Sequence, residues 1–178
     1  MADSAPTLLF LCTGNAARSV MAATMMSDRS DQVRVTSAGT HSIEGLPMSS
    51  RTRDALAGHG VGDKSHLSSQ VDDDMVDEAT VIAVFEPMHV NYMRKHHPDA
   101  AAKVGSLRRL AQELEPGPLA TLAERVRQLD LEHQPFASWE EVIDPAGGDL
   151  PVFEASAAEI DELIDVFANK IGAADVGA

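Results

Sequence analysis

The sequence predicts an α/β fold, a three-layer sandwich in which a four-stranded parallel sheet lies between helices. Two short runs, 7–11 and 79–85, are continuously apolar, as is typical of strands that are covered on both faces. Stretches with helical spacing separate the expected strands, which favours parallel pairing through right-handed crossovers. The first apolar run leads through a short loop into a helical stretch. In such folds ligands bind at the carboxyl ends of the strands.

The first half of the chain alternates between strand and helix patterns. A strand over Thr7–Leu11 precedes a helix over Ser19–Asp28. Gln32–Thr36 alternates like a second strand, and we expect the following S-A-G-T to end it. Helical spacing runs over Ser49–His59, where glycines follow. The acidic run that begins at Asp72 is interpreted as the solvated start of another helix.

The second half continues the alternation. Ala79–Phe85 is expected to be a buried strand, followed by a helix over Pro87–His96 and a short fourth strand over Lys103–Leu107. A helix over Leu119–Leu131 follows a break rich in proline and glycine, and a long last helix spans Phe153–Ile171. A short loop over residues 12–19 lies between the first strand and the first helix.

Composition restricts the classes of function. The length favours a single domain over residues 1–178, with 172–178 as a frayed tail. A net charge of −14, from 14 Lys and Arg against 28 Asp and Glu, argues against nucleic acid or an anionic membrane as a partner. The single cysteine excludes an internal disulfide and fits a reducing, cytoplasmic location. The apolar run at 8–11 is too short for a signal peptide or a membrane span.

Residues 12–19 read C-T-G-N-A-A-R-S, and this pattern predicts an anion site. The N–H groups of a tight loop and a helix N-terminus converge on a bound oxyanion and favour phosphate. The same field is expected to lower the pKa of the Cys12 thiol, from about 8.5 to roughly 3.5–7.5, and so to supply a nucleophilic thiolate. Five fixed letters at this spacing arise by chance with a frequency on the order of 10⁻⁵ in a chain of this length.

Each loop residue has an expected role. Gly14 allows a positive φ, and Asn15 also tolerates a left-handed conformation while its amide ties down the loop. The Arg18 guanidinium offers a planar fork to two phosphate oxygens. The Ser19 hydroxyl can donate to the Cys12 sulfur. The predicted phosphate-binding set is Thr13, Gly14, Asn15, Ala16, Ala17, Arg18 and Ser19.

This motif resembles that of the low-molecular-weight protein tyrosine phosphatases, which share their fold with the thioredoxin-coupled arsenate reductases. The resemblance runs from Leu8 to about Ile171 and is weakest over residues 108–140, and Ala17 stands where the family has a second cysteine. Ser37 in S-A-G-T and His66 in S-H-L-S-S-Q-V match family positions. The resemblance implies that these two join Asn15 and Ser19 in a network that braces the loop.

The resemblance also implies a general acid. The family carries an aspartate in a D-P motif ahead of its last helix, and Asp144 and Pro145 stand there in this chain. An aryloxide leaving group needs a proton as the P–O bond breaks, and a positioned carboxylic acid contributes roughly 10²–10⁴-fold to the rate. The proline pushes Asp144 into extended geometry, which suits a loop that presents a side chain over a site.

Two departures from the family concern the substrate pocket. Relatives that hydrolyse phosphotyrosine flank the pocket with aromatic residues, whereas Ile43 and Ala146 occupy these positions here. The single Tyr and Trp of the chain, Tyr92 and Trp139, lie elsewhere in the sequence. An aromatic contact is worth about 0.5–1.5 kcal/mol, so we expect weaker binding of phosphotyrosine with unchanged chemistry. His41 is a further candidate for contact with substrate.

The predicted function is therefore that of a phosphomonoester hydrolase acting through a cysteinyl-phosphate, with Cys12, Arg18 and Asp144 as catalytic residues. The expected substrates are phosphorylated proteins or small aryl phosphates, and no cofactor or metal is expected. Two alternatives stay open: arsenate reduction with an external small thiol, and a catalytically weak phosphopeptide-binding module. The sequence leaves the oligomeric state open.

Overall fold

The computed structural model describes residues 5–62, 65–117 and 120–172. The predicted tail lies outside these ranges, except for Gly172, which is the last residue of a helix. Within the described ranges, no helix has the length and apolar character needed to cross a membrane.

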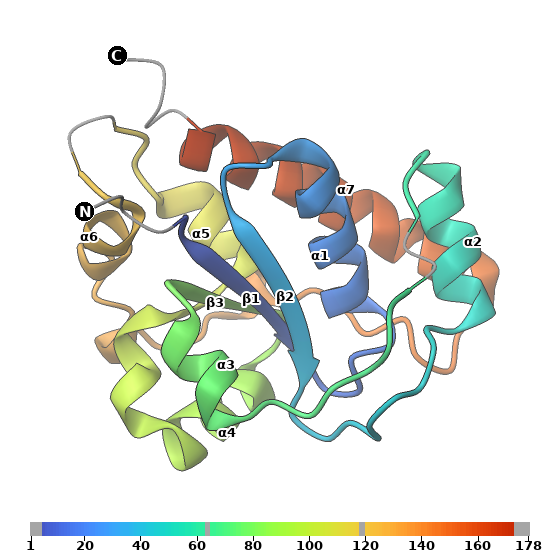
Figure 1. Ribbon diagram of the computed structural model, residues 1–178, viewed down its shortest axis with the longest axis horizontal. Helices are drawn as coiled ribbons and strands as arrows, with labels where there is room; N and C mark the ends of the chain where they lie inside the picture. Colours follow the sequence, from blue (N-terminus) through green and yellow to red (C-terminus); the bar gives the residue numbers. More distant parts are fainter. Residues whose placement is uncertain (1–4, 63–64, 118–119, 173–178) are drawn as a thin grey trace.

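Four parallel strands form the centre of the described part of the chain, and this confirms the predicted fold class (Figure 1). The strands are β1 (Thr7–Cys12), β2 (Arg34–Gly39), β3 (Val81–Val84) and β4 (Val104–Ser106), in the spatial order β2-β1-β3-β4. β1 therefore lies between β2 and β3, and the loops that follow these three strands meet at one edge of the sheet.

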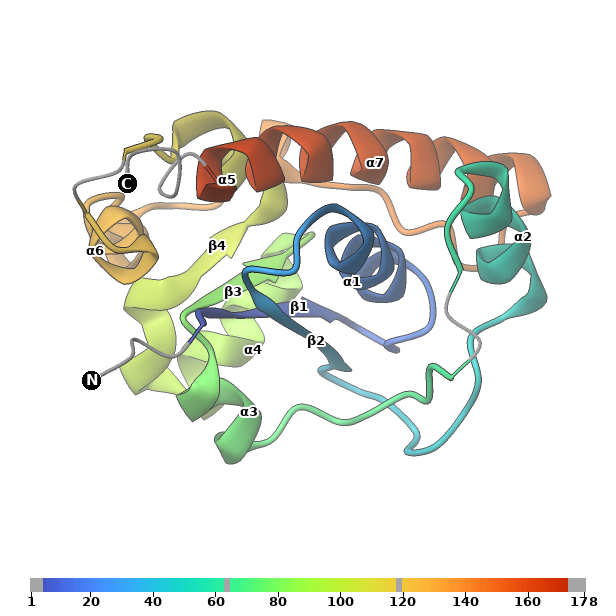
Figure 2. The ribbon, with the colours of Figure 1, turned by 45° about the horizontal axis from the view of Figure 1, so that its top comes forward.

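Helices cover both faces of the sheet, as Figure 2 shows. One face carries the larger set: α1 (Arg18–Arg29), α2 (Ser50–Gly58), α5 (Leu107–Glu113), α6 (Leu122–Arg127) and α7 (Leu150–Gly172). The other face carries α3 (Asp73–Glu78) and α4 (Pro87–His96). Short 3-10 helices span Pro98–Lys103, Leu131–His133 and Ser138–Glu140.

The continuous apolar run of β1 follows from this layering. Leu8 and Phe10 pack into the core beneath α1 and α7, and Leu9 and Leu11 pack into the core beneath α3 and α4. All four side chains are at most 1% exposed. Because successive side chains of a strand point to opposite faces, a strand that is covered on both faces must be apolar at every position.

The prediction that S-A-G-T ends the second strand is wrong. β2 continues to Gly39, which pairs with Cys12, and Ser37 pairs with Phe10. Glycine is required at position 39, because a Cβ there would lie 2.5 Å from the carbonyl oxygen of Thr13. This close approach seats the loop that follows β1 against the end of β2.

Two further differences concern short helices. α5 was not expected, since its seven residues are too few to show helical periodicity; Ser106 caps it by accepting the N–H of Arg109. The helix expected over Leu119–Leu131 is shorter in the structure: a capping box at Thr121 starts α6, and the left-handed Asp130 (φ 52°) prevents its continuation. Leu119 itself lies outside the described residues.

Candidate active site

Loop 12–19 joins β1 to α1 and places Cys12 at the carboxyl edge of the sheet. Cys12 is 3% exposed, and its Sγ lies 3.0 Å from the Oγ of Ser19. The prediction of a positive φ at Gly14 is wrong: the left-handed residue of this loop is Asn15, with φ 50°. A Cβ at Gly14 would meet no atom within 4 Å, so the space beside it is open.

The side chain of Asn15 is fully buried and connects the loop to its neighbours. Its Nδ2 donates to Ser19 Oγ (2.9 Å) and to Ser37 Oγ (3.0 Å), and its Oδ1 accepts the backbone N–H of Ser69 (2.9 Å). His66 Nε2 lies 3.0 Å from the Asn15 carbonyl oxygen. The structure thus brings together the four residues of the expected bracing network and adds Ser69, which the sequence did not indicate.

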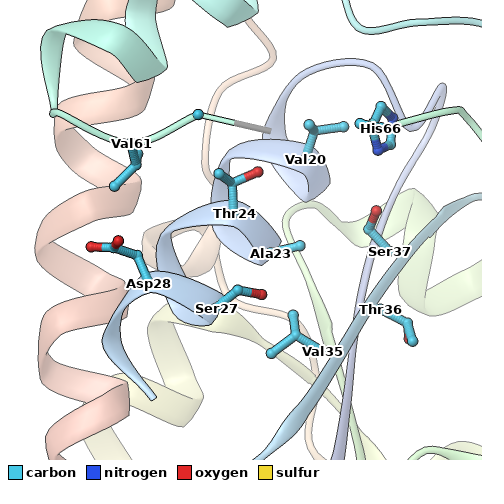
Figure 3. Close-up of a pocket in the computed structure, with 11 residues that line it drawn as sticks. Val20, Ala23, Thr24, Ser27, Asp28, Val35, Thr36, Ser37, Val61 and His66 are labelled. Atoms are coloured by element: carbon cyan, nitrogen blue, oxygen red, sulfur yellow. The ribbon is translucent and has the colours of Figure 1, made fainter. Parts of the chain in front are cut away.

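Ser37 and His66 also border a cavity of about 370 Å³ beside α1, and Figure 3 shows both on the same side of it. Cys12 is not among the residues that line this cavity. Because the cavity reaches Ser37 and His66, their side chains stay partly accessible although they contact the buried Asn15.

Arg18, the first residue of α1, is 1% exposed. Its Nη1 donates to Glu86 Oε2 (3.0 Å) and to the Val142 carbonyl oxygen (2.9 Å), and its Nη2 lies 3.1 Å from Asp144 Oδ2. Its Nε is buried and has no hydrogen-bond partner among the described residues. Nη1 is thus fixed by protein groups, while Nε and Nη2 form the pair that can hold two oxygens of one phosphoryl group.

The expected general acid lies against this guanidinium. The Asp144 side chain is 40% exposed; one oxygen contacts Arg18, and Oδ1 accepts the N–H of Ala146 (3.1 Å). The segment that carries it reaches the loop from a position more than a hundred residues further along the chain. The structure therefore places Cys12, Arg18 and Asp144 at one edge of the sheet.

Glu86 and His89 form a second set of contacts that sequence reasoning missed. His89 is fully buried, and its Nδ1 accepts the N–H of Phe85 (3.3 Å), so its proton resides on Nε2, which lies 3.0 Å from Thr13 Oγ1 and 3.2 Å from Glu86 Oε1. Burial, and then the charge of Arg18, lower the pKa of His89 to about 3. The ring is neutral, and it donates toward the loop. Glu86 and His89 come directly after β3, and β3 neighbours β1. Their place in the chain was therefore the sequence signal that could have indicated contact with the 12–19 loop.

The residues expected at the pocket mouth are exposed. Ile43 is 70% exposed, and Ala146 is also exposed next to Asp144. His41 donates its backbone N–H to the Thr13 carbonyl oxygen (2.9 Å), and its ring meets that of Tyr92 edge-on at 5.5 Å. Tyr92, distant in sequence and set aside for that reason, thus lies next to a residue that contacts the loop.

The first strand of the parallel sheet ends in a cysteine, and a tight loop leads from it to a helix whose first residue is an arginine. This is the architecture of a cysteine-dependent phosphatase. Residues 7–119 match the family model of the low molecular weight phosphotyrosine protein phosphatases, which is more than half of the chain. The chain belongs to this family, and it is a protein phosphatase, a hydrolase. The resemblance carried by the loop motif is thereby confirmed.

Two curated relatives illustrate the range of the family. A protein-arginine-phosphatase of Geobacillus stearothermophilus is 27% identical over 165 residues, which is 92% of this chain and 95% of the relative. The probable low molecular weight protein-tyrosine-phosphatase EpsP of Ralstonia nicotianae is 31% identical over 106 residues, 60% of this chain and 71% of the relative. The relatives are phosphatases, which does not favour the alternative of arsenate reduction.

Solved structures of phosphatases share the fold of this chain. The YwlE arginine phosphatase from Geobacillus stearothermophilus superposes with a TM-score of 0.75 at 27% identity, covering 93% of this chain and 92% of that one. The tyrosine phosphatase Wzb from Escherichia coli K30, in complex with sulphate, has a TM-score of 0.75 at 16% identity, which shows a common fold.

Proposed function

We propose that this phosphatase hydrolyses phosphorylated protein side chains through a cysteinyl-phosphate, with Cys12 as nucleophile, Arg18 as phosphate ligand and Asp144 as general acid. One observation carries the proposal. The buried Arg18 has Nη1 occupied by protein acceptors, contacts Asp144 through Nη2, and keeps Nε free of partners among the described residues. A phosphoryl group held by Nε and Nη2 would lie between the loop of Cys12 and the carboxyl of Asp144.

In the first step, the Cys12 thiolate attacks phosphorus in line with the leaving group. The S–P bond forms as the bond from phosphorus to the leaving oxygen breaks, and the proton of Asp144 passes to that oxygen. Loop amides and Arg18 hold the equatorial oxygens, where charge develops. The Ser19 hydroxyl, 3.0 Å from Cys12 Sγ, can donate to the thiolate before attack and after departure.

In the second step, water attacks the cysteinyl-phosphate. Asp144, now a carboxylate, takes a proton from this water, the P–S bond breaks, and inorganic phosphate leaves as the thiolate is restored. Asp144 ends protonated, ready for the next cycle. The alternative of a weak phosphopeptide-binding module needs neither a nucleophilic sulfur nor an acid.

We infer phosphotyrosine and aryl phosphates as the first substrate class, because the chain belongs to the phosphotyrosine phosphatase family. Phosphoarginine is the second candidate, since the relative that matches over 92% of this chain is named a protein-arginine-phosphatase. Ile43 and Ala146 offer little aromatic surface, so we expect no strong preference for phosphotyrosine peptides over small aryl phosphates. We also propose that the chain acts as one domain in the cytoplasm.

Two variants test the proposal. Cys12→Ser should abolish turnover of phenyl phosphate, phosphotyrosine and phosphoarginine peptides alike, yet keep the affinity for vanadate, whose contacts come from Arg18 and loop amides. Turnover within tenfold of wild type would contradict the nucleophile assignment. Asp144→Asn should slow poor leaving groups more than good ones in a series of substituted phenyl phosphates. An equal loss across that series would remove Asp144 from the acid role.

A further inference from the structure

A buried ion pair joins α5 to the segment that leads to Asp144. Glu140, the last residue of the 3-10 helix Ser138–Glu140, is 2% exposed. Its Oε1 accepts from Arg109 Nη2 (2.7 Å) and from the N–H of Ala137 (2.8 Å), and its Oε2 accepts from Arg109 Nε (3.1 Å) and Ser106 Oγ (2.6 Å). Both carboxylate oxygens are therefore fully engaged.

Arg109 is held as firmly as its partner. It is 8% exposed, its Nη1 pairs with Glu113 one turn along α5 (3.0 Å), and its guanidinium lies over the ring of Trp139, 5.4 Å from the centroid. The pKa of Glu140 is lowered: burial opposes ionisation, but hydrogen bonds from Arg109, Ala137 and Ser106 outweigh it. Glu140 is thus a buried carboxylate that stays ionised and is held by Arg109, Ala137 and Ser106.

The chain from Glu140 to Asp144 has alternating surroundings. Glu141 has extended backbone angles, Val142 is fully buried and Ile143 is 74% exposed. The N–H of Val142 donates to the Phe85 carbonyl oxygen (2.8 Å), and the Val142 carbonyl oxygen accepts a hydrogen bond from Arg18 Nη1 (2.9 Å). In an extended segment alternate side chains point to the same side, so a shift by one residue would turn Val142 outward and Asp144 away from Arg18.

We propose that the Arg109–Glu140 pair positions the general acid, by fixing the register of residues 140–144 so that Asp144 stays against Arg18. The inference rests on the acid role proposed for Asp144. Removing the Glu140 carboxylate would leave Glu113, at Nη1, as the remaining acidic partner of Arg109 among the described residues, and Nε and Nη2 would lose their charged acceptor. The segment would then move to let water reach these buried groups. Arg109 lies within the part of the chain that the family model matches, whereas Glu140 and Asp144 both lie beyond it.

The test measures kcat/KM for phenyl phosphates of graded phenol pKa in Glu140→Gln, Asp144→Asn and the double variant. In Glu140→Gln we expect the rate with phenyl phosphate to fall roughly tenfold more than that with 4-nitrophenyl phosphate, because only the poor leaving group needs the proton. In the Asp144→Asn background the same change should leave the leaving-group dependence unaltered, since the two residues act through one proton transfer. Vanadate affinity should stay within about threefold.

Glu159→Gln is the matched control. Glu159 pairs with Arg108, the neighbour of Arg109 on α5, but it belongs to α7, and no ion pair joins it to residues 140–144 within the described part of the chain. We expect an unchanged leaving-group dependence in this variant.

An equal loss across the series in Glu140→Gln, no loss, or an added steepening on top of Asp144→Asn would overturn the inference. If Glu140→Gln does not fold, Arg109→Lys keeps the charge and loses the bidentate contact; it should steepen the dependence by a smaller factor, and a flat response would overturn the inference equally. A uniform loss in Asp144→Asn alone would instead contradict the proposed function.

Discussion

Asn15 combines two requirements of the 12–19 loop in one residue. Its left-handed backbone (φ 50°) turns the chain, and its buried amide hydrogen-bonds with Ser19, Ser37 and Ser69. Left-handed conformations are costly for most residues and tolerable for asparagine, and glycine adopts them without strain. Backbone conformation and hydrogen bonding at this position can therefore be separated by mutation.

We expect Asn15→Gly to keep the turn and lose the amide, and Asn15→Ala to lose both. Each change leaves the N–H of Ser69 without its acceptor, which costs about 1–3 kcal/mol of unfolding free energy. The alanine variant should lose about 1–2 kcal/mol more, from the cost of its left-handed backbone. Urea unfolding and kcat/KM measure both effects, with Ser37→Ala as a milder control. Equal unfolding free energies of the two variants would show that the left-handed backbone at position 15 does not cost alanine any stability.

Oxidation of Cys12 is a second property set by single residues. Ala17 occupies the position of the second loop cysteine in relatives, and the chain has no other thiol, so a sulfenic acid on Cys12 has no internal partner. We expect peroxide to inactivate the enzyme reversibly at short times and, through the sulfinic acid, irreversibly at long times. Bound phosphate should slow the loss. Activity after dithiothreitol and intact mass measure this; full recovery after prolonged exposure, with no mass gain of two oxygens, would contradict the expectation.

At the scale of elements, most strands and helices could be predicted, whereas the contacts between them could not. The apolar runs of β1 and β3 are distinctive because both faces of these strands are covered. In contrast, α5 depends on a single cap at Ser106, and the length of β2 depends on the fit of Gly39 against Thr13. Such features arise from tertiary packing and leave no periodic pattern in the sequence.

The same distinction applies to the site. Cys12, Arg18 and Asp144 could be proposed because their motifs are local or resemble those of a family. Glu86 and His89 act on the loop only because β3 pairs with β1, and Glu140 meets Arg109 only because α5 lies beside the acid segment. No local motif indicates the strand order, and the strand order determines which residues become neighbours.

The buried His89 at α4 predicts a pH dependence of stability. Its pKa is about 3 in the folded protein against an ordinary value of 6.5, so the unfolded chain binds more protons between these values. Its contribution to stability is present above pH 6.5 and is lost as pH falls toward 3, with a slope of up to about 1.4 kcal/mol per pH unit.

We therefore expect His89→Gln to lessen the fall in unfolding free energy between pH 6.5 and 4, measured by urea titration, even if the variant is less stable at pH 7. His133→Gln is the control. The exposed His133 has a raised pKa through its hydrogen bond to Asp130, so its small contribution is present at low pH and lost as pH rises. Identical pH slopes in wild type and His89→Gln would mean that His89 is protonated in the folded protein.

At the scale of the whole molecule, charge is the dominant feature. The chain carries a net charge of −14, yet the group that we propose as its ligand is dianionic. Arg18 and the loop amides attract phosphate over a few ångström, whereas the surrounding carboxylates repel it over the screening length, which is about 30 Å at 0.01 M salt and 8 Å at 0.15 M. Approach of the substrate and its binding in the loop should therefore respond differently to salt.

We expect kcat/KM for a phosphotyrosine peptide flanked by glutamates to rise severalfold between 10 and 150 mM salt, because screening removes the long-range repulsion. The same phosphotyrosine flanked by lysines should react faster at low salt and lose that advantage as salt increases, since the attraction is screened as well. kcat should change little for either peptide, because the contacts inside the loop are buried and weakly screened. If the two peptides respond to salt in the same direction, the net charge of the molecule does not govern the encounter, and local charges at the mouth of the site do.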